Sequence, residues 1–178
     1  MKKYALKIEE KECWGCKACE VACKQENKSK DGINRIRIHE EWGKKKDGSQ
    51  DFIFRANICR HCDNPPCVDA CPVEAIKKRE DGIVILYEDE CTGCGTCIDT
   101  CPYNAIYFSD EEGKAKKCNM CFERIDNGLI PACADNICLA HCIYFGDARK
   151  IDKMIKERFW LKARIEGKLS ATVITVDE

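Results

Sequence analysis

Cysteine is the residue whose type and spacing point most directly to chemistry in this sequence. Seventeen of the 178 residues are cysteines, a number typical of a disulfide scaffold or of a dense set of metal sites. Two groups are spaced C-x2-C-x2-C-x3-C, and one is widened to C-x2-C-x4-C-x3-C. In chain order the groups are Cys13, Cys16, Cys19 and Cys23; Cys59, Cys62, Cys67 and Cys71; Cys91, Cys94, Cys97 and Cys101; and Cys118, Cys121, Cys133, Cys138 and Cys142. Thiolates gathered in this way are ligands for soft metals.

Three kinds of site compete to explain these cysteines. Disulfides need an oxidising compartment, but the first residues, MKKYALKIEEKEC, lack the apolar stretch of an export signal. Zinc sites usually join two C-x2-C knuckles by a longer loop. The run C-x2-C-x2-C-x3-C followed by proline is instead typical of bacterial ferredoxins, in which the fourth cysteine binds the neighbouring cluster. The sequence therefore favours 4Fe-4S clusters, and a zinc-binding interaction module is the less favoured alternative.

The last cysteine group can be read in two registers. In the first, Cys133 and Cys138 bind two different clusters and Cys142 is not a ligand. In the second, Cys138 and Cys142 keep the three-residue gap of the other groups, and Cys133 is not a ligand. Aligning CLAHCIYF with CPYNAIYF places Cys142 on Ala105 and favours the first register. A third reading has zinc held by Cys142 and His141, which would leave three clusters.

Short apolar stretches around the groups indicate the elements that would position the cysteines. The three-residue gap in each group suits a short helix. Because β-branched and aromatic residues flank the groups, we expect strands at 4–8, 52–58, 82–87, 105–108 and 142–145. Strand, cysteine loop, short helix and strand form the half-unit of a ferredoxin. The sequence therefore predicts an α+β fold made of such half-units.

Two further segments lie outside this repeat. Residues 24–51 are polar and carry two Asp-Gly pairs, so we expect a hairpin-like insertion with a strand over 33–42. The apolar spacing after Asp147 predicts an amphipathic helix that Asp147 caps and Gly167 closes. A final strand is expected in SATVITV, residues 170–176. Neither segment has a cofactor signature.

The order of the cysteine motifs resembles the four-cluster iron-sulfur subunits of molybdenum and tungsten bis-pyranopterin oxidoreductases, of the dimethyl sulfoxide reductase small-subunit type. Members of that family also accompany tungsten aldehyde oxidoreductases and benzoyl-CoA reductases. The matching motifs are CWGCKACEVACKQEN (13–27), CRHCDNPPCVDACPVEAI (59–76), CTGCGTCIDTCPYNAI (91–106) and KCNMCFERIDNGLIPAC (117–133). The sequence departs from the pattern at Cys23 and Cys138, which lack a following proline, and in having four residues between Cys133 and Cys138 instead of three.

The resemblance implies two nested double-ferredoxin modules followed by a C-terminal helix-strand extension. It also implies four 4Fe-4S clusters, or three if the outer pair is incomplete. The corresponding ranges are 1–147 for the whole core, 52–109 for the inner pair, 1–23 with 114–147 for the outer pair, 24–51 for the polar insertion and 148–178 for the extension.

The cross-ligation of that family, carried onto the matching cysteines, implies four sets of iron ligands. Each set takes three cysteines from one group and a fourth from its partner group. With the first register of the last group, the sets are Cys59, Cys62, Cys67 and Cys101; Cys91, Cys94, Cys97 and Cys71; Cys13, Cys16, Cys19 and Cys138; and Cys118, Cys121, Cys133 and Cys23.

No part of the sequence resembles an active site. It has no glycine-rich phosphate loop after a strand, no nucleophile elbow and no H-E-x-x-H motif. The resemblance implies a non-catalytic electron-transfer subunit. Such a subunit relays single electrons between a large tungsten or molybdenum pterin catalytic subunit and a further electron donor or acceptor subunit. A free polyferredoxin serving several enzymes is the alternative.

Charge and hydropathy restrict the partners. Thirty basic and 31 acidic residues give a net charge of −1, which offers no electrostatic footprint for nucleic acid. The apolar runs are far shorter than the ~20 residues of a membrane span. We therefore expect a cytoplasmic protein with no direct membrane span. Three basic runs, Lys44–Lys46, Lys77–Arg79 and Lys114–Lys117, are interpreted as solvated loops.

Some side chains beside the cysteines could adjust the clusters. Trp14 could exclude water from a cluster or pack in the core, and His61 could donate a hydrogen bond to a cluster sulfur. Four basic residues adjacent to cysteines could shift reduction potentials through their charge, although simple solvation explains them equally well: Lys17, Lys24, Arg60 and Lys117.

Overall fold

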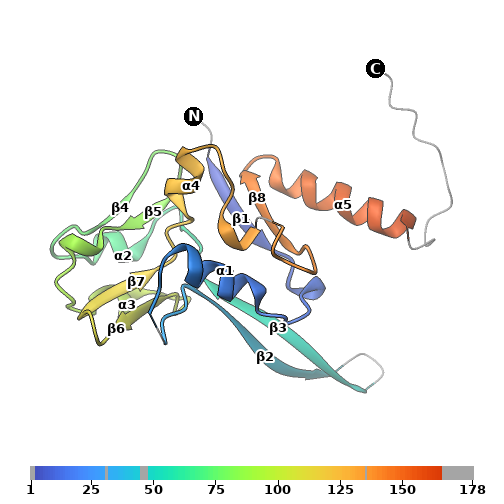
Figure 1. Ribbon diagram of the computed structural model, residues 1–178, viewed down its shortest axis with the longest axis horizontal. Helices are drawn as coiled ribbons and strands as arrows, with labels where there is room; N and C mark the ends of the chain where they lie inside the picture. Colours follow the sequence, from blue (N-terminus) through green and yellow to red (C-terminus); the bar gives the residue numbers. More distant parts are fainter. Residues whose placement is uncertain (1–2, 31, 45–47, 135, 166–178) are drawn as a thin grey trace.

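Four two-stranded antiparallel sheets organise the chain. The computed structural model describes residues 3–30, 32–44, 48–134 and 136–165. In these residues the strand pairs are β1 (Tyr4–Ile8) with β8 (Ile143–Asp147), β2 (Ile36–Lys44) with β3 (Gln50–Ile58), β4 (Ile76–Lys78) with β5 (Val84–Leu86), and β6 (Ile106–Ser109) with β7 (Lys114–Lys117) (Figure 1). The β1–β8 pair joins the two ends of the cysteine-rich region.

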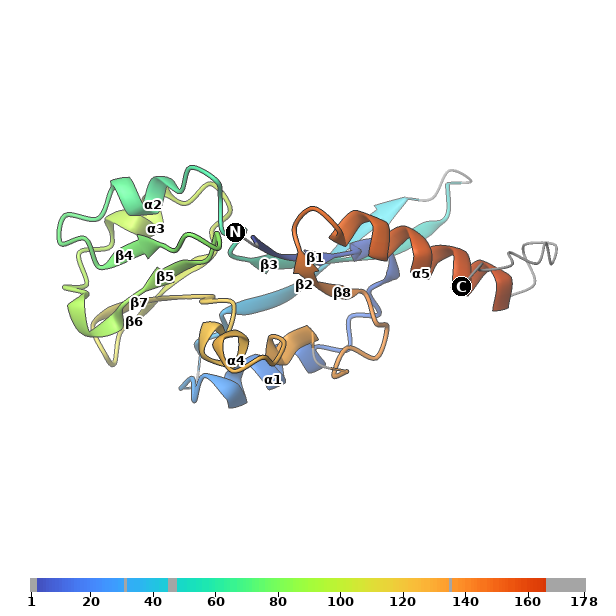
Figure 2. The ribbon, with the colours of Figure 1, turned by 90° about the horizontal axis from the view of Figure 1, so that it is seen from above.

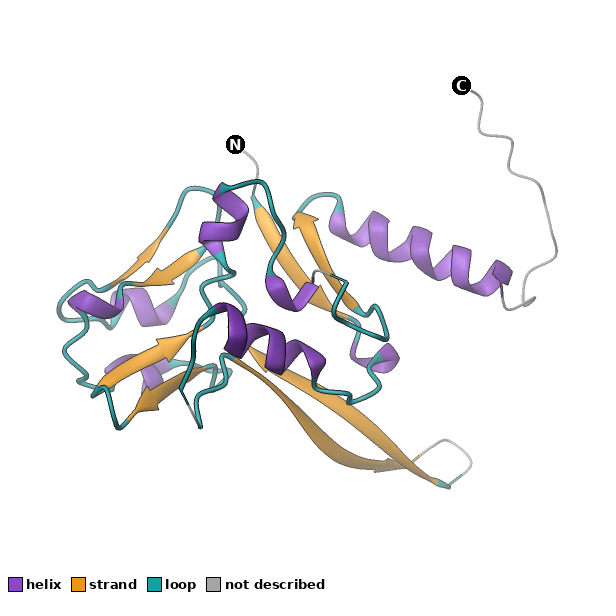
Figure 3. Cartoon of the chain, viewed as in Figure 1, coloured by secondary structure: helices purple, strands orange, loops and turns teal. Residues whose placement is uncertain are grey.

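Short helices alternate with these strands, and loops make up much of the remaining chain (Figure 3). The α-helices are α1 (Ala18–Glu26), α2 (Pro66–Asp69), α3 (Thr96–Thr100), α4 (Phe122–Asp126) and α5 (Ile151–Ile165), and the 3-10 turns are η1 (Glu10–Glu12), η2 (Glu88–Glu90) and η3 (Ala132–Ala134). None of the helices in the described ranges combines the length and hydrophobicity needed to cross a bilayer.

The elements gather into two lobes with extensions on one side. Strands β4 to β7 with α2 and α3 form one lobe, and β1, β8, α1 and α4 form the other (Figure 1). Seen from above, α5 and the far end of the β2–β3 hairpin extend away from the first lobe (Figure 2). Near that end Trp42 and Phe52 lie opposite each other with ring centroids 4.3 Å apart, and both are exposed.

Cysteine side chains form a large part of the hydrophobic core. In the second lobe, six of the eleven residues of the main buried cluster are cysteines, and they pack against Ile36, Ile38 and Ile58. In the first lobe, Cys67 and Cys97 are buried among aliphatic side chains of β4 to β7. The aliphatic core is therefore thin, and it surrounds the thiols.

The expected mixed helix and strand fold is confirmed, as are the expected strands, with ends shifted by a few residues. The strand expected at 33–42 is β2, which begins at Ile36 and continues to Lys44. The expected cap at Asp147 is wrong. Asp147 ends β8, its carboxylate accepts hydrogen bonds from Arg149, and α5 begins only at Ile151. Gly167 and the strand expected at 170–176 lie outside the described residues.

Two of the basic runs are not solvated loops. Lys77 and Lys78 lie in β4, and the run Lys114–Lys117 is β7. Lys116 and Lys117 are only 5% and 1% exposed. In the third run, Lys44 ends β2, and residues 45 and 46 lie outside the described part of the chain. Hydrophilic sequence alone therefore misplaced two strands of the first lobe.

Candidate metal-cluster sites

Each of the four cysteine groups begins with the same backbone turn. The residue two positions after the first cysteine has a left-handed backbone, and its N–H points at that cysteine's sulfur. The four contacts are Gly15 to Cys13 (φ 68°, 3.5 Å), His61 to Cys59 (46°, 3.5 Å), Gly93 to Cys91 (74°, 3.4 Å) and Met120 to Cys118 (57°, 3.3 Å). Backbone N–H groups in such a turn form a concave site that favours negative charge, here that of a thiolate.

A second repeated turn follows Cys71, Cys101 and Cys138. The third residue after each of these cysteines is left-handed, and the N–H of the fourth lies near its sulfur. The contacts are Ala75 to Cys71 (3.3 Å), Ala105 to Cys101 (3.5 Å) and Cys142 to Cys138 (3.4 Å), with φ values of 53°, 49° and 51° at Glu74, Asn104 and His141. The backbone therefore places Cys138 where Cys101 lies, and Cys142 where Ala105 lies.

Two cavities are each lined by cysteines from two different groups. One cavity is lined by Cys59, Cys62, Cys67 and Cys101, with three prolines and two aliphatic side chains in its walls. The other is lined by Cys13, Cys16, Cys19, Cys138 and Cys142, with Ile8, Ile38 and Ile143 in its walls. Cysteines from distant parts of the sequence thus face a shared, mostly apolar space.

The thiols around Cys97 and around Cys133 are close enough to raise one another's pKa values. Burial raises the pKa of Cys97 to about 11, and it raises the pKa of Cys133 well above its usual value. Repulsion between neighbouring thiolates adds to both shifts. The neighbours are Cys91, Cys94, Cys67 and Cys71 for Cys97, and Cys118, Cys121, Cys23 and Cys19 for Cys133.

The donor atoms suit a positively charged iron-sulfur core. Burial raises the pKa of Cys19 to about 12 and that of Cys67 to about 11, so these thiols ionise readily only beside a cation. In the described ranges, no three histidine, cysteine or carboxylate side chains are arranged to hold a single metal ion. A cluster is held differently, because each thiolate binds its own iron around a shared core.

Electrostatic effects between thiols of different groups indicate the order in which the groups neighbour one another. After burial, the charge of Cys67 contributes to the raised pKa of Cys97, and the charge of Cys59 contributes to the raised pKa of Cys118. Cys133 is influenced in the same way by Cys19. In space, the order of the groups is therefore the one with Cys97 (the Cys97 group), the one with Cys67 (the Cys67 group), the one with Cys133 (the Cys133 group) and the one with Cys19 (the Cys19 group).

The side chains expected to adjust clusters lie in different surroundings. Trp14 borders the cavity of the Cys19 group but is 64% exposed, so core packing is the wrong interpretation. The Arg60 guanidinium lies 5.9 Å from the Tyr103 ring centroid. Lys17 is exposed, and Lys24 is half-buried. These positions leave Lys117 as the fully buried cation among the four candidates.

His61 has a fixed hydrogen-bonding arrangement. Its Nδ1 accepts the N–H of Val84 at 3.0 Å, so the ring proton of the neutral imidazole is on Nε2. That Nε2 is buried and has no hydrogen-bond partner among the described side chains and backbone. The structure thus leaves a donor available beside Cys62, as the sequence suggested, but shows no contact to a sulfur.

Lys78 is a contact that the sequence interpretation missed. Its Nζ donates hydrogen bonds to the carbonyl oxygens of Cys62 at 2.9 Å and Asp63 at 2.6 Å. These bonds tie β4 to the widened loop of the second cysteine group. Ile76 and Lys78 lie on the same face of a short strand, which could have indicated that Lys78 faces the protein. The run was instead interpreted as a loop.

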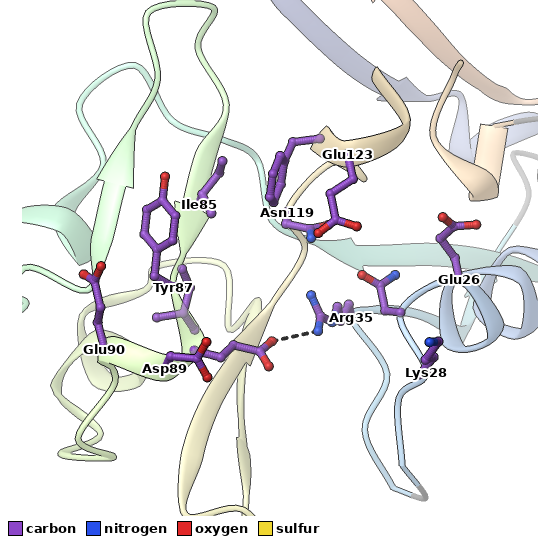
Figure 4. Close-up of a pocket in the computed structure, with 13 residues that line it drawn as sticks. Glu26, Lys28, Arg35, Ile85, Tyr87, Asp89, Glu90, Asn119 and Glu123 are labelled. Carbon is purple, nitrogen blue, oxygen red and sulfur yellow. Dashed lines mark hydrogen bonds and ion pairs between the residues drawn. The ribbon is translucent and has the colours of Figure 1, made fainter. Parts of the chain in front are cut away.

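A polar pocket marks the seam between the two lobes. It is lined by residues from the end of α1, from η2 and from the start of α4, and carboxylates are prominent in it (Figure 4). Within it the Arg35 guanidinium donates to Glu88 at 2.7 Å. Glu88 also accepts a hydrogen bond from Lys116 at 2.6 Å. Paired charges therefore join the residue that precedes β2 to η2 and β7 at the seam.

Comparison with known proteins gives consistent matches. Two family models, each described as a 4Fe-4S dicluster domain, match residues 12–75 and 50–148. The sequence is 38% identical to a tetrathionate reductase subunit of Salmonella typhimurium, an alignment that covers 83% of this chain and only 59% of that protein. It is 37% identical to a polysulfide reductase chain of Wolinella succinogenes, over 92% and 88%. Identity to one chain of the anaerobic dimethyl sulfoxide reductase of Haemophilus influenzae is 36%, over 76% and 70%.

Proposed function

We propose an electron relay, starting from the premise that this protein belongs to the 4Fe-4S dicluster family of iron-sulfur proteins. Four 4Fe-4S clusters would be held by the four cysteine groups. Bound clusters supply one-electron redox chemistry, and the chain's own residues hold, space and shield them. The observation that carries the proposal is the set of four cysteine groups, each with a backbone N–H group directed at the sulfur of its first cysteine.

The proposed ligand sets follow the groups that the structure brings together. They are Cys59, Cys62, Cys67 and Cys101; Cys91, Cys94, Cys97 and Cys71; Cys13, Cys16, Cys19 and Cys138; and Cys118, Cys121, Cys133 and Cys23. Shared cavities support the first and third sets, and mutual electrostatic effects support the second and fourth. The repeated turn after Cys138 supports this cysteine as a ligand and Cys142 as a buried non-ligand.

The nested domain arrangement is part of the same proposal. The inner pair of clusters would lie within 52–109, between β3 and β7. The outer pair would be built from 1–23 together with 114–147, with the hairpin segment 24–51 inserted between the pairs and 148–178 as an extension. Pairing of β1 with β8 across nearly the whole core supports it.

The partner proposal rests on the relatives. Three of them are named as individual subunits or chains of reductases. We infer that this chain passes electrons between a molybdenum or tungsten pterin catalytic subunit and a second electron donor or acceptor subunit. Purification from the native source is expected to yield a stable complex with a pterin-containing protein. Isolation of the chain alone, active with several unrelated enzymes, would favour a free polyferredoxin instead.

Metal analysis tests the cluster assignment directly. Protein purified without oxygen is expected to contain about 16 iron atoms and about 16 acid-labile sulfides per chain, because each of four clusters contributes four of each. On reduction, its electron paramagnetic resonance spectrum should show magnetic interaction between neighbouring clusters. Zinc in place of iron would contradict the relay, and about 12 iron atoms would contradict the count of four.

A further inference from the structure

Lys117 is a buried cation with no carboxylate partner in the described part of the chain. It is 1% exposed. Its Nζ donates hydrogen bonds to two backbone carbonyl oxygens, that of Val84 at 2.5 Å and that of Cys118 at 2.7 Å. Carbonyl dipoles alone do not neutralise a full charge, and a buried ammonium without a counter-charge is costly. The position therefore calls for negative charge nearby.

Neighbouring cations satisfy this requirement with protein carboxylates. Lys116, the preceding residue in β7, pairs with Glu88 and Glu112. Arg35, whose guanidinium also donates to the carbonyl oxygen of Lys117, pairs with Glu88 at 2.7 Å. Of these three buried cations, Arg35 and Lys116 have carboxylate partners and Lys117 has none among the described residues. The contrast indicates that the counter-charge of Lys117 comes from a group other than a protein carboxylate.

Lys117 lies between the two central cysteine groups. It precedes Cys118 and binds its carbonyl oxygen, which places it beside the Cys133 group. It is also close enough to the Cys67 thiol to favour the ionised form. Cys59 and Cys118, one from each group, are themselves near neighbours. The ammonium of Lys117 therefore lies near cysteines of both central groups, Cys67 in one and Cys118 in the other.

The backbone holds this nitrogen in place. Val84 in β5 accepts a hydrogen bond from Lys117 through its carbonyl and donates one from its N–H to Nδ1 of His61. His61 in turn lies in the loop that presents Cys59 and Cys62. A single residue of β5 thus fixes both the cation and the loop of the second group. The charge cannot move away without breaking hydrogen bonds in the core.

We propose that Lys117 is a fixed counter-charge shared by the two central clusters and that it raises the reduction potential of both. The inference rests on the proposed relay. An oxidised 4Fe-4S core with four thiolates carries about −2, and a one-electron reduction makes it about −3. A nearby ammonium stabilises the more negative state more strongly. Lys117 makes no bond to iron. It acts through its charge on the reduction potentials of the two central clusters.

The test compares Lys117→Met with Lys116→Met in the full-length, cluster-loaded protein. Methionine removes the charge while it keeps a long and flexible apolar side chain. Redox titration followed by electron paramagnetic resonance is expected to show two of four reduction potentials lowered in Lys117→Met and the other two unchanged. Lys116→Met is the matched control, because it removes the same charge from the adjacent buried lysine, whose Nζ contacts Glu88 and Glu112 and not the backbone beside the cysteine groups. It should leave all four potentials near those of the unaltered protein.

The outcomes separate charge from shape. If Lys117→Met keeps four clusters with unchanged potentials, or shifts all four alike, the inference is wrong. If Lys117→Met loses clusters, Lys117→Arg decides. Four clusters with unaltered potentials in the arginine variant support a need for positive charge, and loss of the same clusters shows that shape matters instead. Absence of iron from the unaltered protein would overturn the relay itself, which distinguishes the two failures.

Discussion

Removal of iron and sulfide is expected to unfold most of the chain. Six of the eleven residues in the main buried cluster of the second lobe are cysteines, and the described strands pair only in twos. Two-stranded sheets are marginal without a hydrophobic face to pack against. Structural zinc in zinc-finger peptides contributes about 10–16 kcal/mol to folding, and we expect a comparable order of magnitude for each cluster. Four such sites exceed the whole stability of an ordinary domain, about 5–15 kcal/mol.

Circular dichroism and urea titration can measure this effect. Protein treated anaerobically with an iron chelator and reductant should lose the cooperative unfolding transition that the loaded protein shows. The control is protein kept under the same reductant without chelator, which should retain its iron and its transition. A metal-free protein that keeps a cooperative transition and its near-ultraviolet signal would show that the aliphatic core alone specifies the fold.

Local sequence was sufficient to predict the strands that precede the first two cysteine groups. The expected strands at 4–8 and 52–58 correspond to β1 and β3, because short β-branched runs bounded by turns have few other stable conformations. Glycine at positions 15 and 93 marks left-handed turns that place an N–H near a sulfur. His61 and Met120 adopt the same turn without glycine. The cysteine spacing, more than glycine, therefore signals this backbone.

Sequence failed where the surroundings of a residue decide its position. The run Lys114–Lys117 looks solvated by composition, yet it forms β7 with two buried lysines. Hydropathy treats each ammonium as a group that needs water, but Lys116 is paired with carboxylates from distant segments. Lys117 precedes Cys118 in the sequence, but its proximity to Cys67, fifty residues earlier, is not visible in a local window. The opposite error concerns Trp14, for which core packing was one expectation. Its large apolar ring lies in a short loop away from the core and remains exposed.

Long-range pairing also lies beyond local patterns. β1 and β8 pair in register from Tyr4 with Asp147 to Ile8 with Ile143. Nothing within either strand identifies its partner, because both are short and half-buried.

The start of the last helix was also predicted wrongly. α5 begins four residues after Asp147, since that carboxylate binds Arg149 instead of a helix N-terminus. Competing short-range partners of this kind are invisible until the turn after β8 is known.

Cys138→Ala and Cys142→Ala are expected to have opposite effects, although the two sulfurs are only 3.6 Å apart. The turn after Cys138 matches the turn after Cys101, and Cys142 occupies the place of Ala105. Alanine at position 142 should therefore fit and leave about 16 iron atoms per chain, whereas alanine at position 138 should reduce iron to about 12.

Electron transfer through the loaded chain should show the same contrast between these two variants. Loss of the cluster at one end of the row removes an entry or exit point for electrons. Because loss of an outer-shell partner alone costs about 10–100-fold, transfer between the partner subunits should fall at least about 100-fold in Cys138→Ala. Iron analysis and stopped-flow reduction measure the two effects. The reverse pattern would assign Cys142 as the ligand. Retention of iron in both single variants, with loss only in the double variant, would show that either thiol can bind and that the turn does not select one.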